Sequence, residues 1–276
     1  MKKTRELPIL LGVILLVFIM NFMVFRLAYL KEPVFLTHVF TAEQGDGNLN
    51  KFYYIANEDD QRTPVWVFWP ELGEDISGEE PFWCMEEKTR GTYSVRTFAL
   101  TYDFLDELPI ENEMILTQMQ IKWSDGTETL ADVGELHIFA ESKIPREDWA
   151  DEGIVFFDHI PYNSYEKTFL EDVTLTGVNM PLQDAYGDLL TVTDQNGNEI
   201  TFPLVQEKND TFYMQTQFVI PEDDVRSHSV LALKPVLEGV GADGKPMRFF
   251  MEESARYVPE WSVVEIYRIL HMKEAV

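Results

Sequence analysis

The first clear pattern along the chain is an uninterrupted apolar run near its start. Leu7–Phe25 contains nineteen residues and no charge, and Arg26 then precedes a short, mostly apolar stretch up to Leu30. A hydrocarbon core about 30 Å thick is crossed by about 20 helical residues. The run therefore predicts a transmembrane α-helix within residues 7–30, after a short tail at 1–6.

A cleaved signal peptide is the alternative explanation of this run. Signal peptides have apolar regions of about 7–15 residues, followed by a cleavage site of small residues. Here the run is longer, and Arg26–Lys31 (RLAYLK) offers no such site. We therefore interpret the segment as an uncleaved signal-anchor.

Basic residues flank the span on both sides, with Lys2, Lys3 and Arg5 before it and Arg26 and Lys31 after it. The small excess on the N-terminal side favours a cytoplasmic N-terminus. After Lys31 the chain carries 17 basic and 47 acidic residues, which suits an exported domain. We predict a single-pass protein of the cell membrane whose C-terminal domains are extracytoplasmic.

Beyond the anchor, apolar and polar residues alternate with the period of two that is typical of strands. Clear cases in the first half are Thr63–Trp69, Thr92–Tyr102, Ile115–Trp123 and Glu135–Ala140. Ser124–Thr127 (SDGT) follows the third of these. Its Asp-Gly pair favours a tight hairpin, because glycine accepts the positive φ that such turns require.

The second half of the chain shows the same alternation. Two turn-forming segments, Asp194–Asn198 (DQNGN) and Asp243-Gly244, predict further hairpin tips. The predicted strands are Thr168–Thr176, Leu189–Thr193, Glu199–Val205, Thr211–Val219, Ser229–Leu237, Phe249–Met251 and Ser262–Leu270. The last of these also fits a helical period, so a helix is the alternative there.

A break between the two strand-rich halves falls near Lys143–Gly153, where a proline, clustered charges and a glycine interrupt the pattern. Short strands at this spacing are typical of antiparallel sandwiches. We predict an all-β ectodomain after one N-terminal transmembrane α-helix. It consists of two antiparallel immunoglobulin-like sandwich domains, at residues 33–145 and 150–276.

Charge and cysteine content narrow the class of protein. The chain has 22 basic and 48 acidic residues and a formal net charge of −26. Such a surface repels phosphate backbones, so no nucleic-acid partner is expected. The lone Cys84 excludes a disulfide within the chain and a cysteine-cluster metal site. This cysteine usage fits a bacterial envelope better than a disulfide-rich ectodomain.

Recognisable catalytic motifs are absent from the sequence. It contains no nucleophile elbow, no zinc-protease helix motif and no glycine-rich phosphate loop. The aromatic and acidic neighbours of Cys84 are expected to raise the pKa of its thiol, and we interpret Cys84 as a small buried side chain. The many acidic residues provide carboxylate pairs without singling one out, so an exported hydrolase with a carboxylate site stays an alternative.

Weak calcium binding is the one cofactor expectation. Asp194, Asn196, Asn198 and Glu199 place several oxygen ligands in one loop, and Ca²⁺ takes six to eight oxygens. The loop is shorter than the twelve residues of an EF-hand. A plain hairpin tip explains the same residues and is the preferred interpretation.

The densest group of aromatic residues is a candidate binding patch, formed by Trp66, Phe68, Trp69, Phe82 and Trp83. Exposed aromatic rings on a strand can stack on sugars or hold a partner protein. However, apolar residues occupy both faces of the strand V-W-V-F-W, as in a strand buried on both sides. A core role is therefore the preferred interpretation.

These features predict a non-catalytic, membrane-tethered extracytoplasmic protein of the bacterial cell envelope that binds or scaffolds an envelope protein or glycan. An accessory subunit of a membrane transport, secretion or sensory complex is the first alternative. In that case Asn21, a polar residue near membrane depth, would contact a partner helix. Exposure of Asn21 to water at the membrane interface is the other explanation of that residue.

Overall fold

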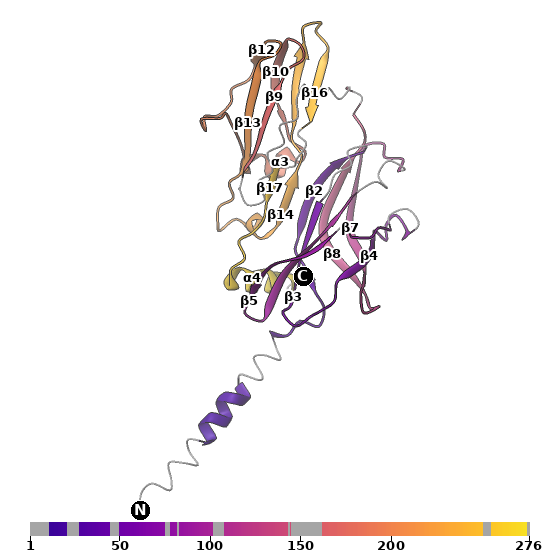
Figure 1. Cartoon of the computed structure of the whole chain (residues 1–276), viewed down its shortest axis with the longest axis vertical. Helices are drawn as coiled ribbons and strands as arrows, with labels where there is room; N and C mark the ends of the chain where they lie inside the picture. Colours follow the sequence, from indigo (N-terminus) through magenta and orange to yellow (C-terminus); the bar gives the residue numbers. More distant parts are fainter. Residues whose placement is uncertain are drawn as a thin grey trace, which may run out of the picture.

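The structure is a computed structural model. It describes residues 11–20, 28–44, 50–74, 78–81, 83–101, 108–142, 144, 162–250 and 255–274. Strands make up 48% of the residues that the structure describes and are its predominant element, which confirms the all-β prediction at this level. Two layered β bodies are stacked end to end, and the N-terminal helix projects from one of them (Figure 1).

Residues 11–20 are helical, and their side chains are exposed. Within the part of the chain that the structure describes, no helix is both long enough and apolar enough to cross a membrane. Residues 7–10 and 21–27 of the predicted anchor lie outside the described residues. The same holds for the predicted tail at 1–6 and for Asn21.

The largest sheet has six strands in the order β17-β14-β2-β8-β7-β4. In that order they span Ala255–Tyr257, Val230–Leu233, His38–Glu43, Glu128–Phe139, Glu113–Trp123 and Pro64–Phe68. Strand β2 runs parallel to both β8 and β14, whereas the other neighbours are antiparallel. The prediction of purely antiparallel sheets is therefore wrong here. Long connections, rather than hairpins, join β2 to its two neighbours.

A four-stranded sheet in the order β1-β3-β6-β5 packs on the six-stranded sheet. Its strands span Val34–Phe35, Asn50–Asn57, Tyr93–Leu100 and Cys84–Arg90. Large apolar side chains from both sheets fill the space between them, including Phe40, Phe52, Phe98 and Trp123. The two sheets form the first sandwich, and helix α4 (Val263–Glu274) packs against its core.

The second sandwich is built from the chain after residue 161. One sheet has the order β12-β10-β15-β16, with strands Leu204–Gln206, Val173–Asn179, Val236–Gly241 and Pro246–Phe250. The other has the order β11-β13-β9, with strands Leu190–Thr193, Thr211–Phe218 and Tyr162–Thr168. Short helices α3 (Gln183–Tyr186), η2 (Gly187–Leu189) and η3 (Val225–His228) connect strands. A separate core contains Phe169, Leu175, Met214, Leu237 and Phe249.

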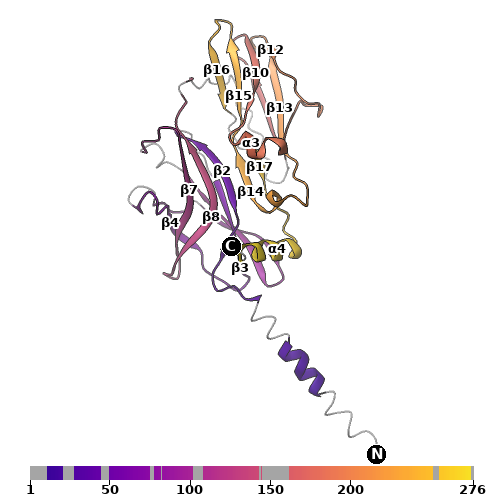
Figure 2. The same ribbon diagram turned by 180° about the vertical axis from the view of Figure 1, so that it is seen from behind.

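The two sandwiches are joined by a strand that changes partners. β14 belongs to the six-stranded sheet, and Lys234-Pro235 carries the chain straight into β15 of the second sandwich. A third apolar cluster brings Val39 of β2 together with Phe218 of β13 and Leu233 of β14. Both views show β14 and β17 below the second sandwich and beside β2 (Figures 1 and 2).

This topology changes the predicted domain organisation. β14 and β17 come from the range 150–276, yet they complete the sheet of the range 33–145 by pairing with β2 and with each other. The predicted boundary, Lys143–Gly153, lies outside the described residues except for Ile144. Two sandwiches are present, but neither is formed by one continuous stretch of chain.

Two of the predicted hairpin tips connect paired strands. Gly126 between β7 and β8, and Gly244 between β15 and β16, have φ values of 85° and 82°. Asp194–Asn198 is also a tight turn, with the Asp194 amide donating to the Asn198 carbonyl at 2.8 Å. An isolated antiparallel bridge joins Thr193 and Glu199 across this turn. Strand β11, however, pairs along its length with β13, and β12 starts only after Pro203, which lacks an amide hydrogen.

Two other predicted strands each include residues of two observed strands. Ser229–Leu237 separates at Pro235 into β14 and β15, because proline cannot continue a ladder. Thr168–Thr176 begins at the last residue of β9 and ends inside β10. Between them lies a turn where the Asp172 carboxylate accepts a hydrogen bond from the Lys208 amide at 2.8 Å.

Ser262–Leu270 is a helix, so the strand prediction is wrong and the alternative is confirmed. The Ser262 hydroxyl accepts a hydrogen bond from the Glu265 amide at 3.0 Å and caps the first turn. Ile266, Ile269 and Leu270 are buried on one face of α4. This spacing places an apolar stripe on one side of a helix, and that stripe packs on the first core.

Candidate binding cleft at the junction of the sandwiches

A cleft of about 460 Å³ opens where the two sandwiches meet. It lies at the ends of β2 and β8 in the first sandwich and beside β10, β15 and β16 in the second. The side chains that define its chemistry are Glu43, Asn112, Phe139, Asn179, Lys234 and Arg248. Its volume falls in the range of about 300–1,000 Å³ that small-ligand sites occupy.

Glu43, the last residue of β2, connects both sides of the cleft. Its carboxylate accepts two hydrogen bonds from the Arg248 guanidinium of β16, at 3.0 and 3.3 Å. It also accepts one from the amide of Ser142, at 2.8 Å. The two charged side chains are only 15% and 12% exposed. This paired fork holds the second sandwich against the first and orders the chain after β8.

Lys234 lies at the crossing point between the two sandwiches and is only 4% exposed. Its backbone amide donates to the hydroxyl of Thr41 at 2.9 Å, which fixes the chain just before Pro235. A lysine is rarely buried this far unless polar groups surround it. Its position places a charged residue beside the largely apolar lining of the cleft.

The remaining lining combines apolar and hydrogen-bonding groups. Phe139, Ala140 and Val236 supply apolar surface. The exposed amides of Asn112 and Asn179 lie at the rim, and Asn179 donates to the Glu238 carboxylate at 3.1 Å. The lining contains two acidic and two basic side chains. The cleft is thus formally neutral, although the whole chain carries a net charge of −26.

The lining offers hydrogen-bonding groups beside apolar surface, and its two acidic residues are Glu43 and the exposed Glu111. The Glu43 carboxylate is already engaged by Arg248 and Ser142, so it is not a free general base. Across the described residues, no group of three or more His, Cys, Asp and Glu side chains is placed to hold a metal ion. The arrangement can hold a polar ligand by hydrogen bonds around an apolar floor.

The candidate calcium loop is an exposed turn whose aspartate is occupied within the turn itself. Asp194 accepts hydrogen bonds from the amides of Asn196 and Asn198, at 2.8 and 2.9 Å, and from the Asn198 side chain at 3.1 Å. The bonds from Asn198 are the main reason that the pKa of Asp194 lies below its usual range. Glu199 follows on the same exposed segment. These contacts are those of a hairpin tip.

The candidate aromatic patch is divided between core and surface. Trp69 is 1% exposed and packs edge-to-face on Phe52, with ring centres 6.0 Å apart. Trp66, Phe68 and Trp83 are half-buried. Phe82 lies outside the described residues. The patch is therefore not a continuous exposed platform in the part of the chain that the structure describes.

Cys84 begins strand β5 and is exposed, so the prediction that it is buried is wrong. Its sulfur lies 3.7 Å from the carbonyl oxygen of Pro64. Partial burial of the thiol raises the pKa of Cys84, which is the expected direction.

Sequence reasoning did not single out Glu43, Lys234 or Arg248. These residues are far apart in the chain, and each is a common residue type, so spacing alone carries no sign of their meeting. One signal was available at Lys234, because a lysine and a proline interrupt the apolar sequence VLALKPVLEGV. A charged residue inside such a run indicates either a break between strands or a buried polar site.

Comparisons with known proteins give no close relative. No protein-family model matches the chain, and no curated protein is significantly similar to it. A protein of unknown function from Porphyromonas gingivalis W83 is 8% identical, with 80% of this chain and 96% of that chain covered and a TM-score of 0.22. CBD12 from CALX1.2 is 12% identical, with coverage of 78% and 83% and a TM-score of 0.24.

The periplasmic chaperone SfaE is 11% identical to this chain, with 79% of this chain and 98% of the chaperone covered and a TM-score of 0.22. These values do not establish a shared fold or function with any of the three structures. The architecture described above is therefore based on the structure of this chain alone.

Proposed function

We propose that this protein is a membrane-tethered, extracytoplasmic binding protein of the bacterial cell envelope, and that the junction cleft holds a polar, overall neutral segment of its partner. The observation that carries the proposal is the cleft itself. It is formed by both sandwiches, it is formally neutral on a strongly acidic chain, and the Glu43–Arg248 pair closes one side of it.

The proposed ligand follows from the chemistry of the lining. A highly acidic ligand would be repelled by the net negative charge of the whole chain before it reached the cleft. A strongly basic ligand would bind anywhere on such a surface and would gain little from this cleft. A neutral ligand with hydrogen-bonding groups, such as a glycan or an uncharged stretch of a protein, matches the amides, hydroxyls and apolar floor.

The proposed tether is the apolar run Leu7–Phe25, which is long enough to span a bilayer. Its central residues 11–20 are helical with exposed apolar side chains, as a lipid-facing segment requires. We place the N-terminus in the cytoplasm and two immunoglobulin-like sandwiches outside it. Such a protein would present the cleft to other envelope components without diffusing away.

The test is co-purification of the tagged full-length protein from its native membranes after light cross-linking. Asn112→Trp places a large side chain at the rim of the cleft, where Asn112 is exposed. Asn196→Trp makes the same change on the exposed hairpin tip and serves as the matched control. We expect a companion glycan or protein with the wild type and the control, and its loss with Asn112→Trp.

Two results would contradict this function. The first is recovery of the companion in equal amounts with Asn112→Trp and Asn196→Trp, which would place binding elsewhere. The second is a wild-type protein that emerges without any companion, or whose purified form hydrolyses peptide or glycan substrates.

A further inference from the structure

Helix α4 has two apolar faces, and the described residues cover one of them. Ile266 and Ile269 are buried in the first core. On the outer side, large apolar side chains remain exposed; they are Val263 (49%), Val264 (60%), Tyr267 (39%) and Met272 (37%). A helix that is apolar on both sides normally has a second partner.

The outer face of α4 lies beside the point where the chain enters the first sandwich. The Tyr93 hydroxyl donates to the carbonyl of Ala28, and the Tyr93 ring packs edge-to-face on Tyr267 of α4, with ring centres 6.1 Å apart. The Arg90 guanidinium also donates to the carbonyl of Trp261, just before α4, at 3.0 Å. Both views show α4 beside β3, at the end of the body from which the N-terminal helix projects (Figures 1 and 2).

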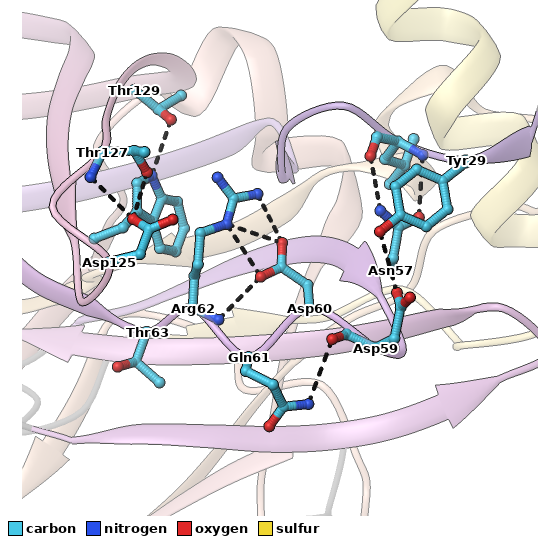
Figure 3. A network of polar contacts seen from close by, with 12 residues as sticks. Tyr29, Asn57, Asp59, Asp60, Gln61, Arg62, Thr63, Asp125, Thr127 and Thr129 are labelled. Atoms are coloured by element: carbon cyan, nitrogen blue, oxygen red, sulfur yellow. Dashed lines mark hydrogen bonds and ion pairs between the residues drawn. The ribbon is translucent and has the colours of Figure 1, made fainter.

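The segment that follows the apolar run is held tightly on the first sandwich. The side chain of Asn57, which is 5% exposed, accepts from the Leu30 amide at 3.0 Å and donates to the Leu30 carbonyl at 2.7 Å. Tyr29 donates to the Asp59 carboxylate at 3.4 Å (Figure 3). Ala28 and Leu30 pack against the first core. From Ala28 onward the chain is therefore part of the folded body and is not a free linker.

These contacts set the height of α4 above a membrane. Ala28 lies three residues after Phe25, the end of the apolar run. Three residues span about 5–10 Å, depending on whether they are helical or extended. The headgroup layer on each side of a bilayer is about 5–8 Å thick. Tyr267 contacts Tyr93, which holds Ala28, so the outer face of α4 is placed near the level of the lipid headgroups.

We propose that the outer face of α4, formed by Val263, Val264, Tyr267 and Met272, rests on the lipid headgroup layer of the membrane that holds the anchor. The proposal rests on the membrane tether proposed above. Tyrosine is enriched at membrane interfaces, and apolar helix faces bind there. Because the anchor keeps α4 next to the lipid at a high effective concentration, a small apolar face is sufficient.

The charges on α4 fit this occupant. Arg268, whose side chain is 58% exposed, borders the outer face and can meet lipid phosphates. Glu265 is only 14% exposed and is engaged by His228 and by Arg268. Among the α4 side chains that the structure describes, Glu265 is thus the acidic one and is already paired, so Arg268 supplies the exposed charge beside the outer face.

Lipid contact can be measured with a fluorescent dye on single cysteines of the full-length protein in phosphatidylcholine nanodiscs. Cys84→Ala removes the exposed native thiol. A cysteine is then placed at Val264 on α4, at Val205 on β12, or at Ile14 in the N-terminal helix. Val205 is 69% exposed and lies in the second sandwich, so it is the matched control for Val264 at 60%. Lipids with a nitroxide near the glycerol backbone quench dyes at the interface, and acyl-chain nitroxides quench dyes in the core.

We expect strong quenching at position 264 by the interfacial nitroxide, none at position 205, and quenching at position 14 by the acyl-chain nitroxide. Quenching at 14 with position 264 behaving like 205 would overturn the lipid contact while leaving the tether intact. No quenching at 14 would overturn the tether, and the lipid contact with it. A dye at 264 that is shielded from both the lipid nitroxide and aqueous iodide would show that a second protein surface covers α4, which also overturns the proposal.

Discussion

His38, on β2, is hydrogen-bonded to backbone groups of two other strands. It is 1% exposed, and its Nε2 accepts from the Tyr53 amide of β3 at 2.8 Å. Because an amide can only donate, Nδ1 must carry the ring proton, which it donates to the Val133 carbonyl of β8 at 2.9 Å. The His38 side chain therefore forms hydrogen bonds with one backbone N–H and one backbone C=O, as a neighbouring strand would.

Replacing His38 with phenylalanine keeps an aromatic ring in the core but removes the buried hydrogen bonds to the Tyr53 amide and the Val133 carbonyl. We expect His38→Phe to lower the free energy of unfolding by about 2–4 kcal/mol, because a buried unpaired polar group costs about 1–3 kcal/mol. Urea denaturation of the purified protein measures this change.

His137→Phe is the matched control for this substitution. His137 is also buried, but its ring nitrogens contact the carboxylates of Glu113 and Glu135, which are 39% and 56% exposed and can turn to water. We expect a smaller loss at His137. Equal losses in the free energy of unfolding at both positions would show that replacing any buried imidazole has this effect, and that the hydrogen bonds from His38 to the backbone are not responsible.

Asp60 and Arg62 form a fork at the loop between β3 and β4 (Figure 3), with Nε–Oδ1 and Nη2–Oδ2 distances of 3.1 and 2.7 Å. Partial burial alone would raise the pKa of Asp60, but the hydrogen bonds and charge of Arg62 outweigh it and hold this pKa below its usual range. The folded state thus favours the ionised carboxylate. Its contribution to stability is present above the unfolded pKa of about 3.9 and is lost as the pH falls through the lower, folded value.

We therefore expect the wild type to lose stability between about pH 5 and pH 2 more steeply than Asp60→Asn does. The pH dependence of the thermal midpoint measures this difference. Asp59→Asn, at the exposed neighbouring residue, controls for loss of one negative charge. Parallel pH profiles for the wild type and Asp60→Asn would contradict the assignment.

At the scale of elements, the parallel pairing of β2 with β8 depends on a glycine. Gly134 pairs with His38 and has a φ of 95°. A Cβ at this position would lie 2.2 Å from the His38 carbonyl oxygen and 2.5 Å from its amide nitrogen. Both atoms belong to the backbone, so neither can move aside without separating the strands.

Gly134→Ala should therefore be far more harmful than Gly126→Ala. Gly126 has a similar φ of 85°, but a Cβ there meets nothing within 4 Å. We expect about 1–2 kcal/mol of destabilisation at Gly126, from the left-handed backbone alone. At Gly134 the loss should be at least about 2 kcal/mol larger, or the protein should fail to fold. Chemical denaturation compares the two, and similar losses would contradict the close approach of β2 and β8.

Strands with a clear alternation were predictable from the sequence, and their partners were not. The predicted ranges around β4, β6, β7 and β13 match the observed strands to within a few residues. Alternation gives the faces of a strand, but it carries no information on which strand lies beside it. For α4, the capping pattern Ser262-x-x-Glu265 was present and would have favoured the helix.

At the scale of the whole molecule, the partly buried ion pair between Glu43 and Arg248 connects the two sandwiches. A double-mutant cycle with Glu43→Gln and Arg248→Met should show a coupling energy of about 1–3 kcal/mol, because water screens this pair little. The exposed pair Lys245–Asp243 is the control and should show no measurable coupling. No coupling at Glu43–Arg248 would mean that apolar contacts alone hold the junction.

The candidate cleft was the least predictable feature from the sequence. Its residues come from the ends of β2, β8 and β10 and from β16, so it exists only after the strand order is known. In the sequence, the feature that indicates such a site is a lysine between two apolar runs. The predicted loop at Asp194–Asn198 was easier to find because its residues are contiguous.

Strand β14 is synthesised long after β2, a strand with which it pairs. β2 lies between β8 and β14, and His38 pairs with Val230, which is made almost two hundred residues later. At roughly 5–20 residues per second, a ribosome needs about 10–40 s to make the intervening chain. Throughout that time one edge of β2 has no neighbour, so the first half of the protein cannot finish folding before the last strands are synthesised. The six-stranded sheet therefore closes only when synthesis is nearly finished, after β14 and β17 have been made.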